Sequence, residues 1–329
     1  HAPAAPTAWE AAPAAGASPL IRWSRGSPMT AIQCELCPKA CVIGPDQSGE
    51  CRLRVNLDGR LRAVTYGHPC SVHVDPVEKK PLHHFRPGTS ILSLATVGCN
   101  LHCRGCQNWE ISQQDPEHAP PAYDLPPAEV VALARSEGCP SIAWTYSDPV
   151  VFYEYALDGS RLAKEEGLRT VLVTAGYVNP RPFRDLARVT DAANIDLKAY
   201  SDAFYRDVCD ATLQPVLDTL VLAKDLGVWV EVTNLLVPTL NDSDGGIRDL
   251  CRWIAANLGR ETPLHFSRFF PRYRMRGLPA TPLPTLDRAR AIARAEGLHH
   301  DYLGNVLRYA AADTSCPRCG VLIVERRGY

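Results

Sequence analysis

Three cysteines stand close together in the run Cys99-Asn-Leu-His-Cys103-Arg-Gly-Cys106. This C-x3-C-x2-C spacing gathers three thiolates in one loop, and thiolates are the usual protein ligands of iron–sulfur clusters. Clusters that only carry electrons are closed by a fourth cysteine, and the sequence has none close to this run. The pattern therefore predicts a 4Fe-4S cluster with one iron that has no protein ligand.

The open iron predicts radical chemistry. S-adenosylmethionine suits this position, because its amino and carboxylate groups can ligate iron and its sulfonium then lies beside an electron source. One electron transferred into the carbon–sulfur bond gives methionine and a 5′-deoxyadenosyl radical, while the protein orients the reactants and excludes water. Zinc held by the three thiolates and His102 is the alternative. We expect the cluster, because the run directly follows the first strand of the barrel predicted below, and a zinc finger has no reason to lie there.

The elements that position this run follow from a pattern that recurs five times. An amphipathic stretch ends in Gly, which closes a helix, and a short apolar or β-branched run follows. Such alternation predicts parallel strands joined by right-handed helical crossovers, in about six strand–helix units. The expected strands are 91–97, 141–145, 170–174, 194–197, 228–236, 264–269 and 302–304.

Polar residues at every second position of several strands favour a barrel over an open doubly wound sheet. A sheet covered by helices on both faces would bury these side chains without partners, whereas barrel enzymes place them near the carboxyl ends of the strands. The sequence thus predicts an α/β chain with a partial (β/α)6 TIM-like barrel. The polar positions are Asn194, Asp196 and Lys198, then Glu231 and Thr233, then His265 and Ser267.

Composition bounds the remaining possibilities. The chain has 329 residues, of which 46% are hydrophobic, and a net charge of −1. No apolar run approaches the roughly 18 residues that a membrane span needs, and neutral charge gives no general attraction to nucleic acid. We expect a flexible tail over 1–33, a Cys-rich cap domain over 34–89, the barrel over 90–310 and a short knuckle over 311–329.

Thirteen cysteines are too many for core filling alone, and their clustering favours metal ligation in a reducing cytoplasm over a disulfide framework. An N-terminal group has the spacing C-x2-C-x3-C-x9-C, and zinc is favoured there because a structural metal stabilises a segment too small for its own core. A second iron–sulfur cluster that relays electrons, or a vestige, are the alternatives. This group is Cys34, Cys37, Cys41 and Cys51.

The last cysteine pair, Cys316 and Cys319, is half of a zinc knuckle. It is either free of metal or completes a zinc site with thiols of the N-terminal group. The four cysteines outside these groups are interpreted as small buried hydrophobes. They are Cys70, Cys139, Cys209 and Cys251.

Several motifs in order make the chain resemble the radical SAM superfamily, and within it the AmmeMemoRadiSam-system radical SAM proteins, relatives of pyruvate formate-lyase activating enzyme. The resemblance extends from Cys34 to Tyr329. The motifs are Cys34-Glu-Leu-Cys37-Pro, Asp75-Pro-Val-Glu-Lys-Lys-Pro81, Gly98 through Cys106 to Ser112, Asp196-Leu-Lys198, Val237-Pro-Thr-Leu-Asn-Asp242, His265-Phe-Ser-Arg-Phe269, Gly304-Asn305 and Cys316-Pro-Arg-Cys319-Gly320.

The resemblance implies roles for individual residues. Cys99, Cys103 and Cys106 would ligate the cluster, and a flavodoxin or ferredoxin-type protein would reduce it. The segment after the second strand would receive the methionine amino group, and residues at the ends of later strands would contact the rest of the cofactor. These residues are Thr145, Tyr146, Ser147 and Asp148, then Asp196, Lys198, Glu231, Thr233 and His265, with Gly304 and Asn305 at the adenine.

The chain departs from the family where substrate would bind. Ser147-Asp148 stands where Asn-Glu is usual, Ala175-Gly176 replaces Asn-Gly, and Phe269 to Arg272 replaces Phe-His-Pro-Asp. A basic stretch results, and guanidinium groups pair with carboxylates or phosphates in a bidentate manner. We therefore expect a small acidic substrate, with a solvated charged loop as the alternative. The arginines are Arg268, Arg272, Arg274 and Arg276.

Three classes of function follow. The favoured class is a biosynthetic enzyme whose adenosyl radical abstracts hydrogen from a small acid, for example in the decarboxylation of a nucleoside sugar acid such as cytosylglucuronate. The second is an activase that generates a glycyl radical on a partner protein. The third is a non-catalytic scaffold that binds metal. A small-molecule enzyme should cover its barrel mouth, and about 90 residues precede the cysteine run and could form that cover.

Overall fold

The computed structural model of the chain describes residues 24–25, 31–306 and 312–326. Most of the predicted tail, 1–33, lies outside these residues. No helix within these ranges is long and apolar enough to cross a membrane.

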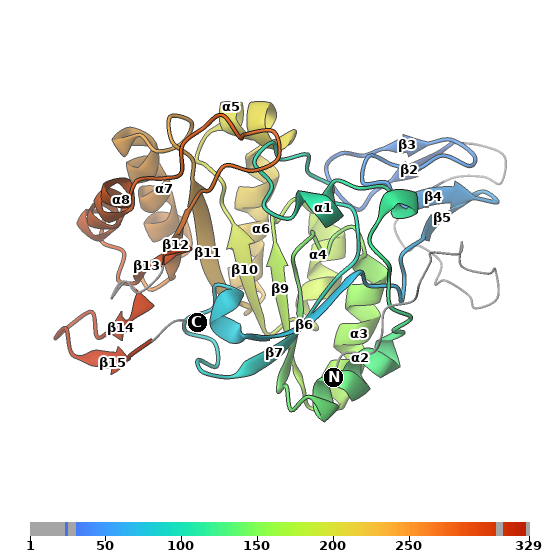
Figure 1. Cartoon of the computed structure of the whole chain (residues 1–329), viewed down its shortest axis with the longest axis horizontal. Helices are drawn as coiled ribbons and strands as arrows, with labels where there is room; N and C mark the ends of the chain where they lie inside the picture. Colours follow the sequence, from blue (N-terminus) through green and yellow to red (C-terminus); the bar gives the residue numbers. More distant parts are fainter. Residues whose placement is uncertain (1–23, 26–30, 307–311, 327–329) are drawn as a thin grey trace.

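An eight-stranded sheet forms the centre of the molecule (Figure 1), with the strand order β13-β12-β11-β10-β9-β8-β7-β6. β7 to β13 run parallel, as the repeating pattern predicts, and β6 pairs antiparallel with β7. The strands are β6 (Ser71–Pro76), β7 (Ser90–Ala95), β8 (Ser141–Trp144), β9 (Arg169–Thr174), β10 (Ala192–Asp196), β11 (Trp229–Leu236), β12 (Leu264–Arg268) and β13 (Asp301–Gly304).

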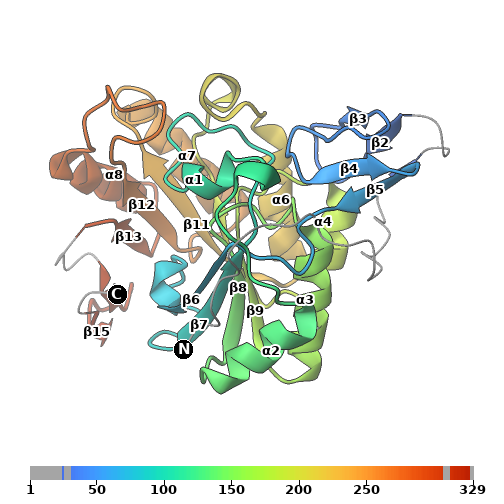
Figure 2. The same ribbon diagram turned by 45° about the vertical axis from the view of Figure 1, so that its right-hand side comes forward.

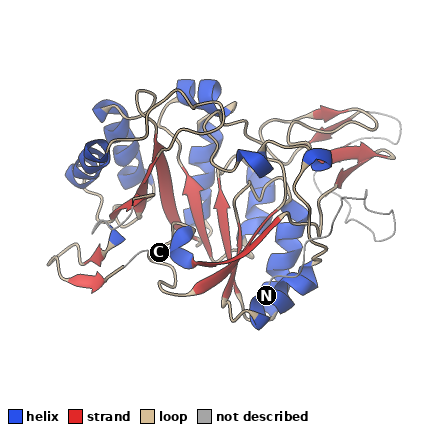
Figure 3. Cartoon of the chain, viewed as in Figure 1, coloured by secondary structure: helices blue, strands red, loops and turns tan. Residues whose placement is uncertain are grey.

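Six helices connect the parallel strands and cover the outer face of the curved sheet (Figure 3). Each crossover follows the βα pattern of a barrel, and the sheet stays open between β13 and β6. The predicted partial (β/α)6 barrel is confirmed. The helices are α2 (Pro127–Ser136), α3 (Tyr153–Glu165), α4 (Pro180–Ala187), α6 (Gln214–Asp225), α7 (Asp244–Asn257) and α8 (Leu283–Ala295).

Close contact between helix and sheet is visible where α3 crosses β8. Trp144 is fully buried and donates from Nε1 to the Ser160 hydroxyl at 2.8 Å. A side chain at Gly159 would lie only 2.5 Å from the indole ring, so the absence of a side chain there lets the helix approach. Packing of this kind excludes water from the outer side of the sheet.

The Cys-rich segment forms a small antiparallel unit, here called the cap (residues 32–63), beside the carboxyl ends of the parallel strands (Figure 1). The rest of the predicted 34–89 domain joins the barrel, because residues 71–76 are β6 and residues 77–85 enter the barrel interior. The cap strands are β2 (Ile32–Cys34), β3 (Val42–Ile43), β4 (Arg54–Leu57) and β5 (Arg60–Ala63), and β1 (Ser24–Arg25) pairs with β2.

The C-terminal pair of strands, β14 (Thr314–Ser315) and β15 (Leu322–Val324), lies far from the cap in both views (Figures 1 and 2). Arg326 donates from Nη2 to the His83 carbonyl at 2.5 Å, which ties this hairpin to the segment inside the barrel. Cys316 and Cys319 belong to the hairpin. They therefore do not complete a metal site with the cap cysteines.

The cap meets the barrel at Gly98, directly before the three-cysteine run. Gly98 has φ +83°, and an added Cβ would lie 2.7 Å from the Cys51 carbonyl oxygen and 2.8 Å from Leu53 Cγ. Gly138 also has a positive φ, +66°, but its Cβ would meet no atom within 4 Å. Alanine at either glycine would have to adopt the left-handed backbone conformation, but only alanine at Gly98 would also have to displace the cap. Comparison of the two positions therefore separates these two costs.

We predict that Gly98→Ala lowers the free energy of unfolding more than Gly138→Ala does. Both variants carry about 1 kcal/mol for alanine in the left-handed region, and overpacking at Gly98 adds roughly 1–3 kcal/mol. Urea titration of both variants measures the difference. Equal losses would show that the cap does not press on this loop.

Candidate active site

The three-cysteine loop (residues 98–108) has no helix or strand of its own and is held by its neighbours. A short π-helix, Tyr205–Cys209, lies beside it. The backbone N–H of His102 donates to the Cys209 carbonyl (3.1 Å), and that of Arg104 donates to the Val208 carbonyl (2.9 Å). π-Helical turns often occur at functional sites, and this one fixes the path of the loop.

The three thiols of this loop are free and half-buried. Burial raises the pKa of the Cys99 and Cys106 thiols. Cys103 differs, because a hydrogen bond with the Cys209 thiol, helped by the Lys198 ammonium, lowers the pKa of Cys103. The structure thus brings Cys209, interpreted from sequence as a plain core residue, against the second of the three thiols.

The zinc alternative at this loop required His102, and the structure turns that ring elsewhere. Its Nδ1 lies 2.7 Å from Asp210 Oδ2, and its Nε2 lies 3.3 Å from the Glu50 carbonyl oxygen. Lys39 Nζ pairs with Glu50 at 2.8 Å and Asp210 at 2.7 Å, so an ammonium already occupies this acidic group. His102 therefore helps to join the cap to the loop and is not directed at the thiols.

The segment after β8 is bound tightly into the sheet. The Asp148 carboxylate accepts hydrogen bonds from the Thr174 hydroxyl (3.0 and 3.1 Å) and from the backbone N–H groups of Val150 (3.0 Å) and Ala175 (2.8 Å). Burial raises the pKa of Asp148, and these donors act against the rise. The Ser147 hydroxyl donates to the backbone just after β7 (2.7 Å). Both side chains therefore fix the loop that is predicted to receive the methionine amino group.

Other predicted residues gather at the carboxyl ends of the strands. Asp196, the last residue of β10, forms an ion pair of 2.9 Å with Lys198. Thr233 is the register partner of Asp196, and its buried hydroxyl has no hydrogen-bond partner within the described part of the chain. At Gly304 a Cβ would lie 2.7 Å from a serine hydroxyl of β12, and Asn305 turns the chain away with φ +59°.

The side chains of Glu231 and His265 bind each other and are not free to contact a ligand. His265 Nε2 lies 2.7 Å from Glu231 Oε2, and the backbone N–H groups of His83 and His84 donate to the same carboxylate at 2.9 and 2.8 Å. Burial raises the pKa of Glu231, but these partners lower it overall. The two residues lie near the start of β11 and β12, where residues 77–85 fill the barrel interior; we call this segment the plug.

The plug also brings a charged pair that sequence reasoning did not single out. Lys80, 1% exposed, pairs with Asp75 of β6 at 2.6 Å. The Tyr146 hydroxyl donates to the same carboxylate, and Lys80 Nζ lies 4.3 Å from the Tyr146 ring centre. Burial, partly offset by Asp75, lowers the pKa of Lys80 to about 8. Tyr146 therefore connects the segment after β8 to the plug.

The basic stretch after β12 folds back over the three-cysteine loop. The Arg274 N–H donates to the Arg104 carbonyl (3.0 Å), and the rings of Tyr273 and Trp109 stack at 5.3 Å. Arg268 Nε donates to the Thr281 carbonyl (2.8 Å), and its guanidinium lies over the Phe270 ring. Arg272 is exposed and has no ion pair among the described residues.

The geometry therefore places a three-thiol loop and the carboxyl ends of parallel strands at one edge of a partial barrel. A sequence model of the Radical SAM superfamily matches residues 93–254. The chain is also 47% identical over 295 residues to the uncharacterized protein MJ0808 of Methanocaldococcus jannaschii, covering 90% of this chain and 87% of that one. The chain belongs to the radical SAM superfamily. This family uses a 4Fe-4S cluster and S-adenosylmethionine.

Two further comparisons agree with this assignment. The chain is 27% identical over 165 residues to pyruvate formate-lyase-activating enzyme of Clostridium pasteurianum, which covers 48% of this chain and 66% of that enzyme. A radical SAM methyltransferase from Sphaerobacter thermophilus shares the fold with a TM-score of 0.51, at 19% identity, over 72% of this chain and 71% of that one. The radical SAM fold of this chain is thereby confirmed, along with the expected homology to the activating enzyme.

We predict that Lys80→Met destabilises the protein by about 3–5 kcal/mol, because it leaves a buried carboxylate without its main partner. Lys79→Met is the matched control. Lys79 pairs with the same Asp75 at 2.8 Å, but its side chain is 48% exposed, and loss of such a pair costs at most about 1 kcal/mol. Chemical unfolding of the two variants measures both values. Similar small losses would mean that the buried pair does not hold the plug.

Proposed function

We propose that this chain cleaves S-adenosylmethionine reductively to a 5′-deoxyadenosyl radical and abstracts hydrogen from a small acidic molecule. The observation that supports the acidic substrate is the basic stretch folded over the three-cysteine loop, with Arg272 exposed and unpaired among the described residues. A guanidinium at that position can pair with a carboxylate or a phosphate. Decarboxylation of a nucleoside sugar acid stays a prediction.

The three-thiol loop fits the cluster that the family uses. Its donors are three free thiols, and the Lys198 ammonium and Cys209 thiol favour the charged form of one of them. Cys99, Cys103 and Cys106 would hold the cluster, which when bound supplies the electron for cleavage of the cofactor. Lys198 would offset the negative charge of the thiolates, and the buried Thr233 hydroxyl can donate to a ligand at the same edge.

Coverage of the site favours a small molecule over a protein. Residues 268–276 pack on the loop from one side, through Arg274 and the Tyr273–Trp109 stack. The cap presses on Gly98 from another, and the plug fills the far end of the barrel. Exclusion of water by such covers protects a radical from side reactions.

An activase is the second candidate, because the chain matches about two thirds of a pyruvate formate-lyase-activating enzyme. Such a function needs the 268–276 stretch to move and admit a segment of a partner protein. A glycyl radical detected by electron paramagnetic resonance on an added partner, with no small molecule required, would favour it. A protein with metal but without cofactor cleavage would instead be a scaffold.

We predict that Cys103→Ala abolishes the reductive cleavage of S-adenosylmethionine, because two thiolates cannot hold the cluster of this loop. Cys139→Ala is the control, since Cys139 is also buried but lies in the loop before β8, outside the three-cysteine loop. The measurement is 5′-deoxyadenosine formed by anaerobically reconstituted protein with dithionite. Cleavage retained by Cys103→Ala would contradict the assignment of the loop.

Arg272 gives a test of the acidic substrate. Extracts and candidate acids are screened for a compound that stimulates 5′-deoxyadenosine formation and passes deuterium into it. With that compound, we expect Arg272→Ala to reduce turnover by about tenfold or more, as for a lost charged hydrogen bond of roughly 1.5–3 kcal/mol. Cleavage without substrate should be unchanged. Equal losses in the two assays would remove the argument for an acid.

A further inference from the structure

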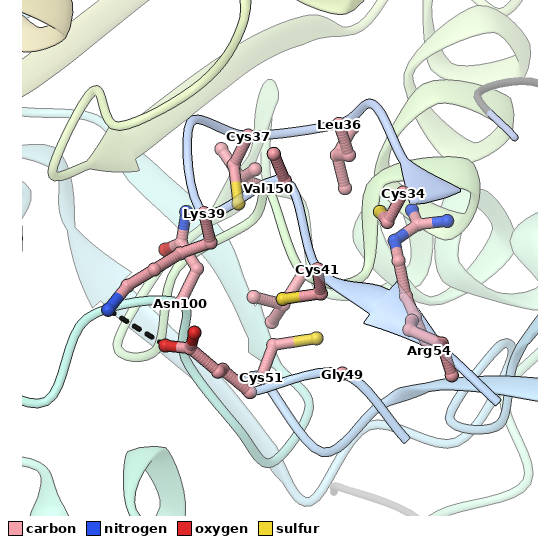
Figure 4. Close-up of a pocket in the computed structure, with 14 residues that line it drawn as sticks. Cys34, Leu36, Cys37, Lys39, Cys41, Gly49, Cys51, Arg54, Asn100 and Val150 are labelled. Carbon is pink, nitrogen blue, oxygen red and sulfur yellow. Dashed lines mark ion pairs between the residues drawn. The ribbon is translucent and has the colours of Figure 1, made fainter. Parts of the chain in front are cut away.

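The four cap cysteines lie around one pocket that the proposed chemistry does not use. Cys34 ends β2, Cys37 and Cys41 follow in the next turn, and Cys51 comes from the loop before β4. Figure 4 shows their sulfur atoms around a common space, and all four thiols are free. From the sequence, this group could bind zinc, bind a second iron–sulfur cluster, or be a vestige without metal.

Arg54 shows that the pocket requires an anion. Its side chain is 1% exposed and donates from Nη2 to Glu154 Oε2 at 2.7 Å. Its Nε and Nη1 groups are buried and have no partner in the described part of the chain, although Arg54 lines the same pocket as Cys34 and Cys51 (Figure 4). Unpartnered buried donors on a cation are costly. Four thiolates around metal carry a net negative charge and supply the missing partner, which argues against a vestige.

The spacing of the sulfur atoms distinguishes the metals. Zinc binds four thiolates tetrahedrally at about 2.3 Å, which puts the sulfurs roughly 3.8 Å apart. Among the described residues, three potential metal ligands converge within 4.8 Å only at Glu50, His102 and Asp210, so no three cap sulfurs do. The same holds for the three thiols of the 98–108 loop. A cubane cluster binds each thiolate on a separate iron and holds the sulfurs further apart than zinc does, which agrees with the wider spacing of both groups.

The walls of the pocket connect the two thiol groups. Asn100, which directly follows Cys99, lines the pocket, and so do Val150 and Val151 of the segment after β8. Leu36 and Ile43 add apolar surface. The cap pocket therefore has apolar walls and adjoins both the three-cysteine loop and the segment predicted to bind the methionine amino group.

We propose that Cys34, Cys37, Cys41 and Cys51 hold a second 4Fe-4S cluster, with Arg54 as its buried counter-cation. Binding of this cluster does not depend on the proposed function. Only the use of this cluster rests on the proposed function. That use is the relay of single electrons from a ferredoxin or flavodoxin-type reductant to the cluster of the 98–108 loop.

Metal analysis of the full chain, purified without oxygen, tests the inference. Wild type should contain about eight iron and eight sulfide, and the triple variant C99A/C103A/C106A about four of each, all in the cap. The quadruple variant C34A/C37A/C41A/C51A should also contain about four. About one zinc per chain in the triple variant, or no metal in it, would overturn the proposal.

Arg54 provides a measurement that does not depend on the folding of the quadruple variant. In the triple-variant background, Arg54→Met should reduce the iron content at least several-fold, whereas Arg60→Met, on the exposed edge of β5, should leave it unchanged. Equal iron contents would contradict the counter-cation role. Wild type that cleaves S-adenosylmethionine but holds zinc in the cap overturns this inference alone, whereas an iron-filled cap without cleavage overturns only the proposed function.

Discussion

The position of three thiols depends on a loop that cannot hold its own shape. Residues 98–108 form no helix or strand, so every constraint on them comes from outside. The π-helix accepts their N–H groups, the cap presses on Gly98, and the stretch after β12 packs over Arg104. The residues that provide these three supports lie 45 to 170 residues from the loop residues they contact, and only the fold around the curved sheet brings them together. Rigid placement of a site by surrounding contacts is what precise chemistry needs.

The barrel interior divides its polar groups between two ends. At the carboxyl ends of the strands, Asp196 and Lys198 pair with each other, and the buried Thr233 hydroxyl has no hydrogen-bond partner in the described part of the chain. At the other end, Glu231 and His265 are satisfied by the plug. Since buried polar groups without partners are costly, unused capacity indicates where a ligand belongs. The plug thus gives Glu231 and His265 a structural role, although Nδ1 of its own His83 is also buried without a partner in the described part of the chain.

Sequence alone predicted the parallel strands well because glycine closures and apolar runs are local signals. Alternation of polar residues correctly identified an interior face. A period of two shows which face of the sheet a residue lies on, but it does not show whether the residue lies near the start or the carboxyl end of the strand. Glu231 and Asp196 therefore could not be told apart in role. β6 was assigned to the cap although Val72 and Val74 flank His73 and Pro87-Gly88 marks a turn before β7, because the antiparallel pairing of β6 with β7 is a tertiary contact. The sequence motif around Lys80 was noted, but the burial of Lys80 against Asp75 depends on tertiary packing and could not be predicted from the motif. The same is true of Cys209, which reaches Cys103 from more than 100 residues away.

The cap is more than a cover, because its contacts favour redox use over mere stability. A structural zinc would satisfy Arg54 equally well in charge, and it could lie anywhere in the cap. This pocket instead shares Asn100 with the three-cysteine loop and Val150 with the segment after β8. The ion pairs of Lys39 with Glu50 and Asp210 then bind the cap to the π-helix that supports the same loop. Displacement of the cap would therefore disturb both thiol groups at once, as expected if electrons pass between them.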